Sequence, residues 1–368
     1  MHEPSGTAMQ IEKTVDDCCD PPSTVLVLGG TGQIGRCMLA EIKQHWPAAQ
    51  LLSPTRAELD LSNGPAVLAY LQQHQPDWLI NCASFTAVDL AEQDLRFSVD
   101  TRFSVDTHWF SDTLWSANFS VDTHPNTLLN AANVSMDTHP NTLLNAVLPM
   151  VLAAYWQTSL KPLTVLHYSS DYVYSGQGDM PWREGDAMAP INAYGRAKAV
   201  GDQALLSALH HNTQSAVATA SRVFILRTCW VYHQQGQNFI NTMLRLAVER
   251  DVLRVVDDQF GAPTPAQWAA QVSGLLLRSQ AASGVYHLAP SGVTSWYGVA
   301  HAVLSSAVSV GLISQVPELI AIESHDYLTP AQRPHNSRLD CQKLQQALGI
   351  EFPEWHRLLR EHMSCRSR

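Results

Sequence analysis

The stretch Thr24-Val-Leu-Val-Leu-Gly-Gly-Thr-Gly-Gln-Ile-Gly35 decides the fold that this sequence predicts. Its first five residues form a short, continuous apolar run, which is typical of a central parallel strand covered on both faces. Glycines at positions 29, 32 and 35 follow at once, and a helical pattern continues through Trp46. The stretch therefore predicts a strand, a tight glycine turn and a helix in direct succession.

A strand, a glycine turn and a helix in this order form a binding site for a dinucleotide in doubly wound proteins. Gly29, Gly32 and Gly35 allow the tight turn, the close approach of a pyrophosphate and the packing of helix on strand, and the helix N-terminus offers free N–H groups. Gln33 and Ile34 lie between these glycines, so we expect them beside the cofactor. A plain tight turn is the alternative, but the flanking strand and helix favour nucleotide binding.

Further strands and helices alternate along the chain. Strands are expected at 51–52, 78–81, 163–167 and 223–226, and helices at 66–75 and before the later strands. This alternation predicts an α/β fold with a Rossmann-type doubly wound parallel sheet. After Trp230 the pattern loosens, until an amphipathic helix around 355–363. We expect a disordered leader over 1–23, a dinucleotide-binding domain mainly over 24–232, and a smaller interleaved α/β substrate domain mainly over 233–368.

Composition excludes several classes of protein. Hydrophobic residues make up 45% of the 368 residues, which is enough for a large core, and the net charge of −10 argues against a nucleic-acid surface. No apolar run is long enough for a membrane span, and no basic segment precedes an apolar one as in a secretory signal. The seven cysteines are scattered without C-x-x-C spacing. These features predict a cytoplasmic enzyme.

A polar repeat interrupts the first domain. Residues 120–131 recur as 135–146 with one difference. The units are too short and too polar for a solenoid, so we expect a looped-out insertion over about 97–141, in which Pro125 and Pro140 interrupt any helix. The repeat adds three histidines: His108, His124 and His139. Duplication of the sequence explains them more simply than a metal site does, so no metal ligand is assigned.

Residues after the second strand indicate which nicotinamide cofactor binds. Proteins that bind NAD usually carry an acid there, whereas this chain has Ser53-Pro-Thr-Arg56 and, behind the third glycine, Arg36. A hydroxyl and two guanidinium groups favour a 2′-phosphate and hence NADPH, with NADH as the alternative if both arginines are merely solvated. Asp60, next to Leu61, is expected either at the adenine amino group or at the N-cap of the following helix.

The segment Tyr194-Gly-Arg-Ala-Lys198 places a phenol and an amine on one face of a helix, because residues four apart are neighbours. We expect the Lys198 ammonium to lower the pKa of the Tyr194 phenol toward neutrality, which suits proton transfer near pH 7. Ser170, just beyond the strand at 163–167, supplies a hydroxyl beside them. This order of glycine turn, serine and Tyr-x-x-x-Lys resembles the extended short-chain dehydrogenase/reductase superfamily.

Longer motifs over about residues 24–363, apart from the repeat, resemble the dTDP-4-dehydrorhamnose reductases. These motifs are 81–89, 167–174, 228–232, 258–264, 295–297 and 330–338. The resemblance implies NAD(P)H-dependent reduction of the C4 ketone of dTDP-6-deoxy-L-lyxo-4-hexulose to dTDP-L-rhamnose. One departure from the family is a serine at position 170 in place of the usual threonine, and this change keeps the hydroxyl.

The same resemblance assigns roles to residues. Ser170, Tyr194 and Lys198 are the implied catalytic set, and Tyr194 and Lys198 also contact the cofactor. Three residues are implied to line the cofactor: Ala83, Ser84 and Thr86. Seven are implied to face the sugar nucleotide: Ser170, Asp171, Tyr172, Trp230, Asn238, Gln259 and Arg333. Trp296 is expected in the core instead.

Other functions remain open. A sugar-nucleotide epimerase or 4,6-dehydratase would keep the glycine turn and Tyr-x-x-x-Lys, but a dehydratase would show Asp-Glu where this chain has Asp171-Tyr172. A non-catalytic dinucleotide-binding regulator, such as the regulatory subunit of methionine adenosyltransferase, is disfavoured by the intact Tyr194 and Lys198. The residues do not distinguish a monomer from a homodimer. They also place no ligands for the Mg²⁺ that bridges a dimer in some relatives.

Overall fold

A six-stranded parallel sheet forms the centre of the computed structural model, which describes residues 21–94, 138–211 and 216–366. The strand order is β2-β1-β3-β4-β5-β10, and every neighbouring pair is parallel. The strands are β1 (Thr24–Leu28), β2 (Gln50–Leu52), β3 (Trp78–Asn81), β4 (Thr164–Ser170), β5 (Arg222–Thr228) and β10 (Gly284–Leu288). The predicted doubly wound sheet is confirmed. Residues 1–20 of the predicted leader and 97–137 of the predicted insertion lie outside the described residues.

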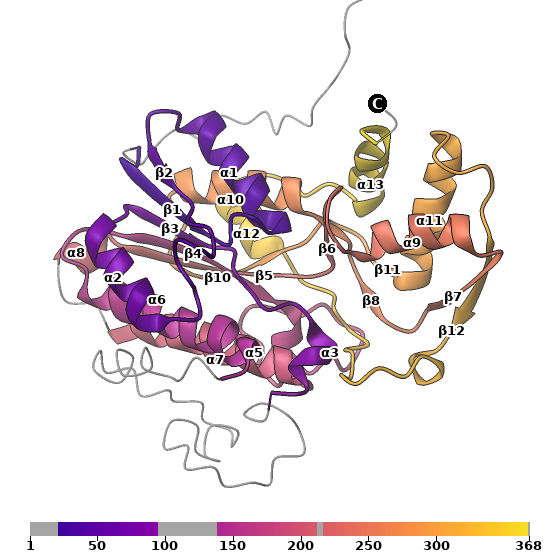
Figure 1. Cartoon of the computed structure of the whole chain (residues 1–368), viewed down its shortest axis with the longest axis horizontal. Coiled ribbons are helices and arrows are strands. Elements are labelled where there is room, and N and C mark those ends of the chain that lie inside the picture. Colours follow the sequence, from indigo (N-terminus) through magenta and orange to yellow (C-terminus); the bar gives the residue numbers. More distant parts are fainter. Residues whose placement is uncertain (1–20, 95–137, 212–215, 367–368) are drawn as a thin grey trace, which may run out of the picture.

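Helices cover both faces of this sheet, which explains why its strands are continuously apolar (Figure 1). One face carries α1 (Gln33–His45), α10 (Ala266–Arg278) and α12 (Gln342–Leu348), and the other carries α2 (Gly64–His74), α6 (Leu148–Thr158) and α7 (Ala193–His211). Alternate residues of β1 divide between the two cores: Val25 and Val27 pack toward α1, and Leu26 and Leu28 toward α2. A short helix, α8 (Ala216–Ala220), precedes β5.

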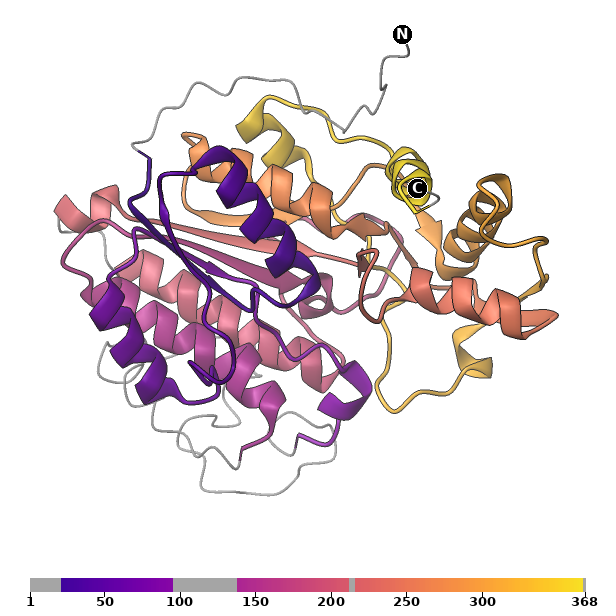
Figure 2. The ribbon, with the colours of Figure 1, turned by 45° about the horizontal axis from the view of Figure 1, so that its top comes forward.

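A smaller lobe lies beside the carboxyl end of the sheet (Figure 2). It contains α9 (Phe239–Glu249), α11 (Trp296–Ser309) and α13 (Trp355–Ser364), and three strand pairs: β6 (Val231–Tyr232) with β9 (Thr264–Pro265), β7 (Val252–Val256) with β12 (Glu318–Ile322), and β8 (Phe260–Gly261) with β11 (Thr294–Ser295). Val299, Val303 and Leu359 lie in its own core. The chain passes through this lobe more than once, because α10 and β10 return to the large sheet. No helix in the described ranges is long and apolar enough to cross a membrane.

Side-chain hydrogen bonds join Asp94, which precedes residues 95–137, to the segment that begins at residue 138. Asp94 is buried, and its Oδ2 accepts hydrogen bonds from Thr142 Oγ1 at 2.7 Å and Asn141 Nδ2 at 3.1 Å. Pro140 occupies the first turn of α5 (Pro140–Thr142), which continues through a π-helical turn (Leu143–Val147) into α6. The expectation that Pro140 interrupts a helix is therefore wrong: a first-turn proline has no intrahelical N–H bond to lose.

Candidate active site

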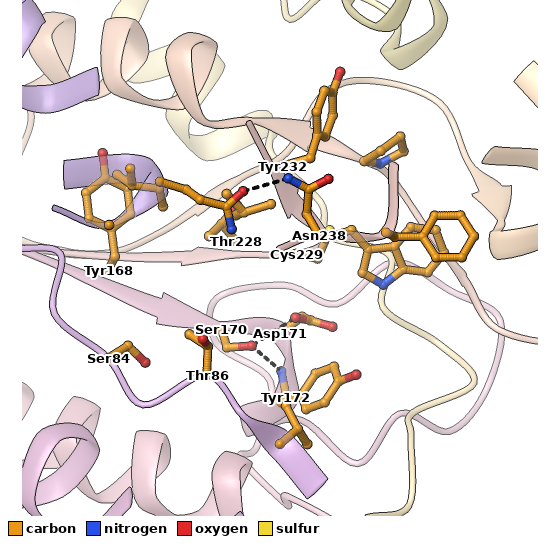
Figure 3. A pocket seen from close by; sticks show the side chains of 18 of the residues that line it. Ser84, Thr86, Tyr168, Ser170, Asp171, Tyr172, Thr228, Cys229, Tyr232 and Asn238 are labelled. Atoms are coloured by element: carbon orange, nitrogen blue, oxygen red, sulfur yellow. Dashed lines mark hydrogen bonds between the residues drawn. The ribbon is translucent and has the colours of Figure 1, made fainter. Parts of the chain in front are cut away.

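A cavity of about 540 Å³ lies between the carboxyl edge of the large sheet and the smaller lobe (Figure 3). This edge is where ligands bind in open α/β sheets. The cavity brings together most of the predicted site residues: Gly32, Gln33, Ile34, Ser84, Thr86, Ser170, Asp171, Tyr172, Tyr194, Lys198, Trp230 and Asn238. Of the predicted residues, ten do not line it: Gly29, Gly35, Arg36, Ser53, Arg56, Asp60, Leu61, Ala83, Gln259 and Arg333.

The glycine turn at the cavity edge has the geometry that a pyrophosphate needs. Gly29 has φ +74°, which other residues rarely adopt, and a Cβ on Gly35 would lie 2.1 Å from the Gly29 carbonyl oxygen. Gly32 is the N-cap of α1 and offers no side-chain cap, so the first N–H groups of the helix remain available to an anion. Ala83 packs against this turn, since a Cβ on Gly29 would meet its backbone nitrogen at 2.6 Å.

Of the residues predicted to choose between NADPH and NADH, Ser53 and Arg56 follow the second strand, whereas Arg36 lies on α1. The Ser53 hydroxyl lies against Gly30, where an added Cβ would be 2.1 Å from its Oγ. Arg56 is exposed, whereas the Arg36 guanidinium is held by the Thr31 carbonyl at 2.8 Å and by Gln235 at 2.5 Å. Arg36 is therefore less free than Arg56 to meet a 2′-phosphate.

Asp60 caps a local turn, accepting hydrogen bonds from Ser62 N at 3.0 Å and Ser62 Oγ at 2.7 Å. These bonds lower the pKa of Asp60, and the nearby Arg56 charge acts in the same direction. The N-cap of α2 is Asn63, so the alternative role of Asp60 as that N-cap is wrong. Leu61, beside it, packs partly buried against the core of the large domain.

The predicted catalytic residues meet at the ends of β4 and α7. The Tyr194 phenol lies within hydrogen-bonding reach of the hydroxyls of Ser170 and Ser84. Lys198, one turn further along α7, is 1% exposed and donates from Nζ to the Tyr168 carbonyl oxygen at 2.7 Å. The structure thus assembles a hydroxyl, a phenol and an amine in one wall of the cavity.

Burial outweighs the electrostatic effect predicted for Tyr194. Desolvation raises the pKa of the Tyr194 phenol to about 12, and desolvation lowers the pKa of Lys198 to about 8. The expectation that Lys198 lowers the pKa of Tyr194 toward neutrality is therefore wrong for the protein without ligands. A high pKa keeps the phenol protonated at neutral pH, and this is the state from which it donates a proton.

Asp171 places a buried carboxyl next to Ser170 in the same wall. Ser170 Oγ donates to Asp171 Oδ1 at 3.0 Å and accepts from Tyr172 N at 3.2 Å, so Ser170 caps the short 3₁₀ turn Asp171–Val173. Asp171 Oδ2 is buried and has no hydrogen-bond partner in the part of the chain that the structure describes. Desolvation raises the pKa of Asp171 to about 7. The Ser337 hydroxyl acts in the opposite direction and lowers this pKa.

A second hydroxyl approaches Tyr194 from the loop after β3. Ser84 Oγ donates to Asn145 Oδ1 at 2.8 Å. The Asn145 amide is fixed, because its Nδ2 donates to the Phe85 carbonyl and to Asn141 Oδ1, each at 2.9 Å. Asn145 lies in the π-helical turn, a feature often found at functional sites. Sequence reasoning did not single out Asn145, because a π turn leaves no recognisable residue pattern.

Two stacked indoles form the wall that faces the smaller lobe. The rings of Trp230 and Trp296 are 3.8 Å apart and inclined by 19°. Trp230 has φ +49°, an unusual conformation for a bulky residue, and a Cβ on Gly261 would lie 2.9 Å from its ring. Trp296 is half-buried and lines the cavity, so its assignment to the core alone is wrong.

Of the other residues predicted to bind the substrate, Asn238 lines the cavity, whereas Gln259 and Arg333 do not. Gln259 lies behind Trp296, accepting from its Nε1 at 3.2 Å and donating to Ser324 Oγ at 2.9 Å. Asn238 does line the cavity, and it joins the two lobes by donating to Gln33 Oε1 at 3.1 Å (Figure 3). Arg333 forms an ion pair with Asp89.

Sequence reasoning also missed two hydroxyls in the cavity wall. Ser169 and Thr228 are buried there, and neither side-chain oxygen has a hydrogen-bond partner among the described residues. Thr228 ends β5, as Ser170 ends β4, and the two pair in the parallel register. A polar residue at the end of a predicted parallel strand was the available signal.

A parallel doubly wound sheet with a glycine turn, and with serine, tyrosine and lysine at its carboxyl edge, defines a dinucleotide-dependent reductase of the short-chain dehydrogenase/reductase type. The family model described as "RmlD substrate binding domain" matches residues 23–104 and 130–366. The chain is 33% identical over 346 residues to the dTDP-4-dehydrorhamnose reductase of Escherichia coli K12, covering 90% of this chain and 94% of that one. The chain belongs to the dTDP-4-dehydrorhamnose reductase family.

Solved structures agree on the fold. A dTDP-4-dehydrorhamnose reductase from Clostridium acetobutylicum is similar with a TM-score of 0.70 and 24% identity, covering 94% of this chain and all of that one. A dTDP-4-dehydrorhamnose reductase from Bacillus anthracis in complex with NADP is similar with a TM-score of 0.68 and 23% identity, covering 92% and 98%. The family model leaves residues 105–129 unmatched, within the predicted repeat insertion.

Proposed function

We propose that the protein uses NADPH to reduce the C4 ketone of dTDP-6-deoxy-L-lyxo-4-hexulose to dTDP-L-rhamnose in dTDP-rhamnose biosynthesis. The observation that carries the proposal is the meeting of Ser170, Tyr194 and Lys198 in a cavity that begins at the glycine turn. The names of the most similar relatives support the substrate, and the NADP complex from Bacillus anthracis supports the cofactor.

The glycine turn fits this cofactor, because the uncapped N-terminus of α1 is open to a pyrophosphate and Ser53 and Arg56 lie near the second strand. When bound, NADPH supplies the hydride. The Ser170 hydroxyl turns from Asp171 to donate to the ketone oxygen as negative charge develops on it, and the Tyr194 phenol donates to the same oxygen and passes its proton to it. Lys198 provides positive charge beside the phenol.

The stacked pair Trp230–Trp296 gives the sugar nucleotide an apolar face, and Asn238 lies between that face and the cofactor turn. Indole faces pack well against flat or weakly polar groups. The cavity therefore has a polar wall for the reacting ketone and an aromatic wall for the rest of the substrate.

The direct test is to mix the purified protein with NADPH and the dTDP-keto-sugar, and to follow the loss of NADPH absorbance. The product is identified as dTDP-L-rhamnose by chromatography against a standard, with Tyr194→Phe as the inactive control. NADPH binding without oxidation would instead indicate a dinucleotide-binding regulator. Size-exclusion measurements with and without Mg²⁺ distinguish a monomer from a homodimer.

A further inference from the structure

A buried ion pair lies one turn beyond the lysine of the proposed catalytic set. Asp202 follows Lys198 by four residues on α7, so both side chains lie on the same face of the helix. Asp202 is fully buried, and its Oδ2 accepts from Arg227 Nε of β5 at 2.9 Å. Burying two charges costs more than burying apolar groups of the same size, so this pair is poorly explained by stability alone.

The second oxygen of the carboxylate faces a histidine. Asp202 Oδ1 lies 3.9 Å from His167 Nε2, and neither atom has a hydrogen-bond partner in the described ranges of the chain. His167 is fully buried on β4. Whether this ring presents a hydrogen or a lone pair to Asp202 depends on which of its nitrogens carries the proton.

Asn81 determines that tautomer. Asn81 Oδ1 accepts from Ala83 N at 3.1 Å, so the Asn81 amide must present its NH₂ group to His167 Nδ1, which lies 3.0 Å away. His167 Nδ1 therefore accepts. Burial, together with the charge of Lys198, lowers the pKa of His167 well below its usual value, so the ring is neutral. Its single hydrogen is on Nε2 and points toward Asp202.

The charged and titratable groups around Lys198 and Asp202 come from four segments. Cys82 follows β3, His167 lies on β4, Arg227 lies on β5, and Tyr194 and Asp202 lie on α7. Burial lowers the pKa of Lys198, and the largest opposing effect is the negative charge of Asp202. Cys82 is a neutral thiol at neutral pH because burial raises its pKa.

We propose that Asp202 is a positioning residue for the reduction: its buried carboxylate, oriented by Arg227 and by the Asn81–His167 pair, keeps Lys198 in the ammonium form. This inference rests on the proposed function for its kinetic consequence, because the ammonium serves the Tyr194 proton transfer. Without the carboxylate, Lys198 becomes neutral at lower pH. The alkaline limb of the pH–rate profile should then move to lower pH.

The first test compares Asp202→Asn with Asp202→Glu. The amide keeps the shape without the charge, and we expect the alkaline limb of kcat to move down by about one pH unit, with about a tenfold loss of kcat on that limb. Asp202→Glu should restore the limb. Asp77→Asn is the matched control, because it removes a carboxylate from a partly exposed ion pair with Lys161 in the same domain. A folded Asp202→Asn protein with an unmoved limb would overturn the proposal.

A second variant addresses misfolding, since Asp202→Asn leaves Arg227 buried without a counter-charge. The double variant Asp202→Asn/Arg227→Met removes both charges. The limb should again move to lower pH, but by less than in Asp202→Asn, because the repulsion between Arg227 and the Lys198 ammonium is removed as well. In a Lys198→Arg background the guanidinium stays charged, so Asp202→Asn should produce no further shift there. A shift that persists in this background would show that Asp202 acts through another group.

The last experiment measures the protonation of Lys198 and does not depend on catalysis. Reductive methylation modifies only neutral amines, so the pH dependence of Lys198 labelling, measured by mass spectrometry, reports its protonation directly. We expect the labelling midpoint of Asp202→Asn to lie about one pH unit below that of the unsubstituted protein. Equal midpoints would refute the role of Asp202. A shifted midpoint in a protein that does not oxidise NADPH would refute the proposed function and leave the electrostatic pairing intact.

Discussion

Arg333, on the segment after β12, forms an ion pair with Asp89 of α3 (Val88–Ala91), with 2.9 Å between Nη2 and Oδ2. Asp89 Oδ1 also accepts from Ala331 N at 3.2 Å. The guanidinium that the family resemblance places toward the sugar nucleotide is thus held by a carboxylate in the protein without ligands. Binding of a diphosphate through Arg333 requires this pair to exchange partners.

Arg333→Met should weaken the binding of dTDP by at least about tenfold, because a charged hydrogen bond contributes about 1.5–3 kcal/mol. Asp89→Asn should strengthen that binding, since Arg333 then leaves a weaker partner. Isothermal titration with dTDP measures both effects, with NADPH binding as the control. If Arg333→Met leaves the affinity for dTDP unchanged, Arg333 only fastens α3 to the smaller lobe.

Tyr194→Phe should lower kcat by at least about 10², the usual range for loss of a positioned proton donor. NADPH binding should be nearly unchanged, because the substitution removes one oxygen and keeps the buried ring. Steady-state rates and a fluorescence titration with NADPH separate the two effects. Near-normal turnover in this variant would exclude Tyr194 as the proton donor.

NADPH should be preferred over NADH, and Arg56→Ala should reduce that preference. A charged contact to the 2′-phosphate contributes up to about 1.5–3 kcal/mol, and less at an exposed position such as Arg56. The measurement is kcat/KM for each cofactor in both proteins. Equal values of kcat/KM for NADPH and NADH in the unsubstituted protein would contradict the preference.

Asp171→Asn should stabilise the protein at alkaline pH. Burial raises the pKa of Asp171 to about 7, so the folded protein holds a proton that the unfolded chain releases near pH 4. The free energy of unfolding therefore falls as pH rises between these values. We expect the thermal midpoint of the variant to exceed that of the unsubstituted protein at pH 8 and to approach it at pH 4. If the thermal midpoints of the two proteins differ by the same amount at pH 8 and at pH 4, Asp171 does not titrate in this range.

Removing residues 102–138, so that Thr101 joins His139, should leave an active reductase. The junction restores one copy of the repeat and retains Asp94, Asn141 and Thr142, whose hydrogen bonds hold the start of α5. The family model omits residues 105–129, which agrees with this view. Thermal midpoint and kcat/KM of the deletion are the measurements. Loss of activity by more than about tenfold, or 1.4 kcal/mol, would mean that the segment contributes to the working site.

The sequence was sufficient to predict five of the six strands of the central sheet, because these five are apolar runs. It did not predict β10, which lies in the part of the chain expected to form mainly the substrate domain. Trp78–Asn81 is a strand with the predicted bounds, but β4 extends to Ser170, three residues beyond the predicted end. The apolar run stops at His167 because the last residues of this strand turn polar side chains toward the cavity. Hydrophobicity therefore marks where the core ends and not where the strand ends.

The site was predictable where its chemistry is local. The glycine turn and the Tyr194–Lys198 spacing each lie within one segment, and both reach the cavity. Trp296 and Asn145 were missed because their roles depend on partners distant in sequence, Trp230 and Ser84. The pKa of Tyr194 was predicted in the wrong direction because residue spacing carries no information about burial.

The hydrogen bond between Asp94 and Thr142 bears on how the length of the chain between these residues can change in evolution. Because the two ends are fastened by side chains that belong to the core, the entropy of closing the intervening chain grows only with the logarithm of its length. We therefore expect a change in the length of this interval to leave α5, α6 and the sheet behind them unaltered. We expect an engineered reporter domain inserted in this interval to leave the reductase folded.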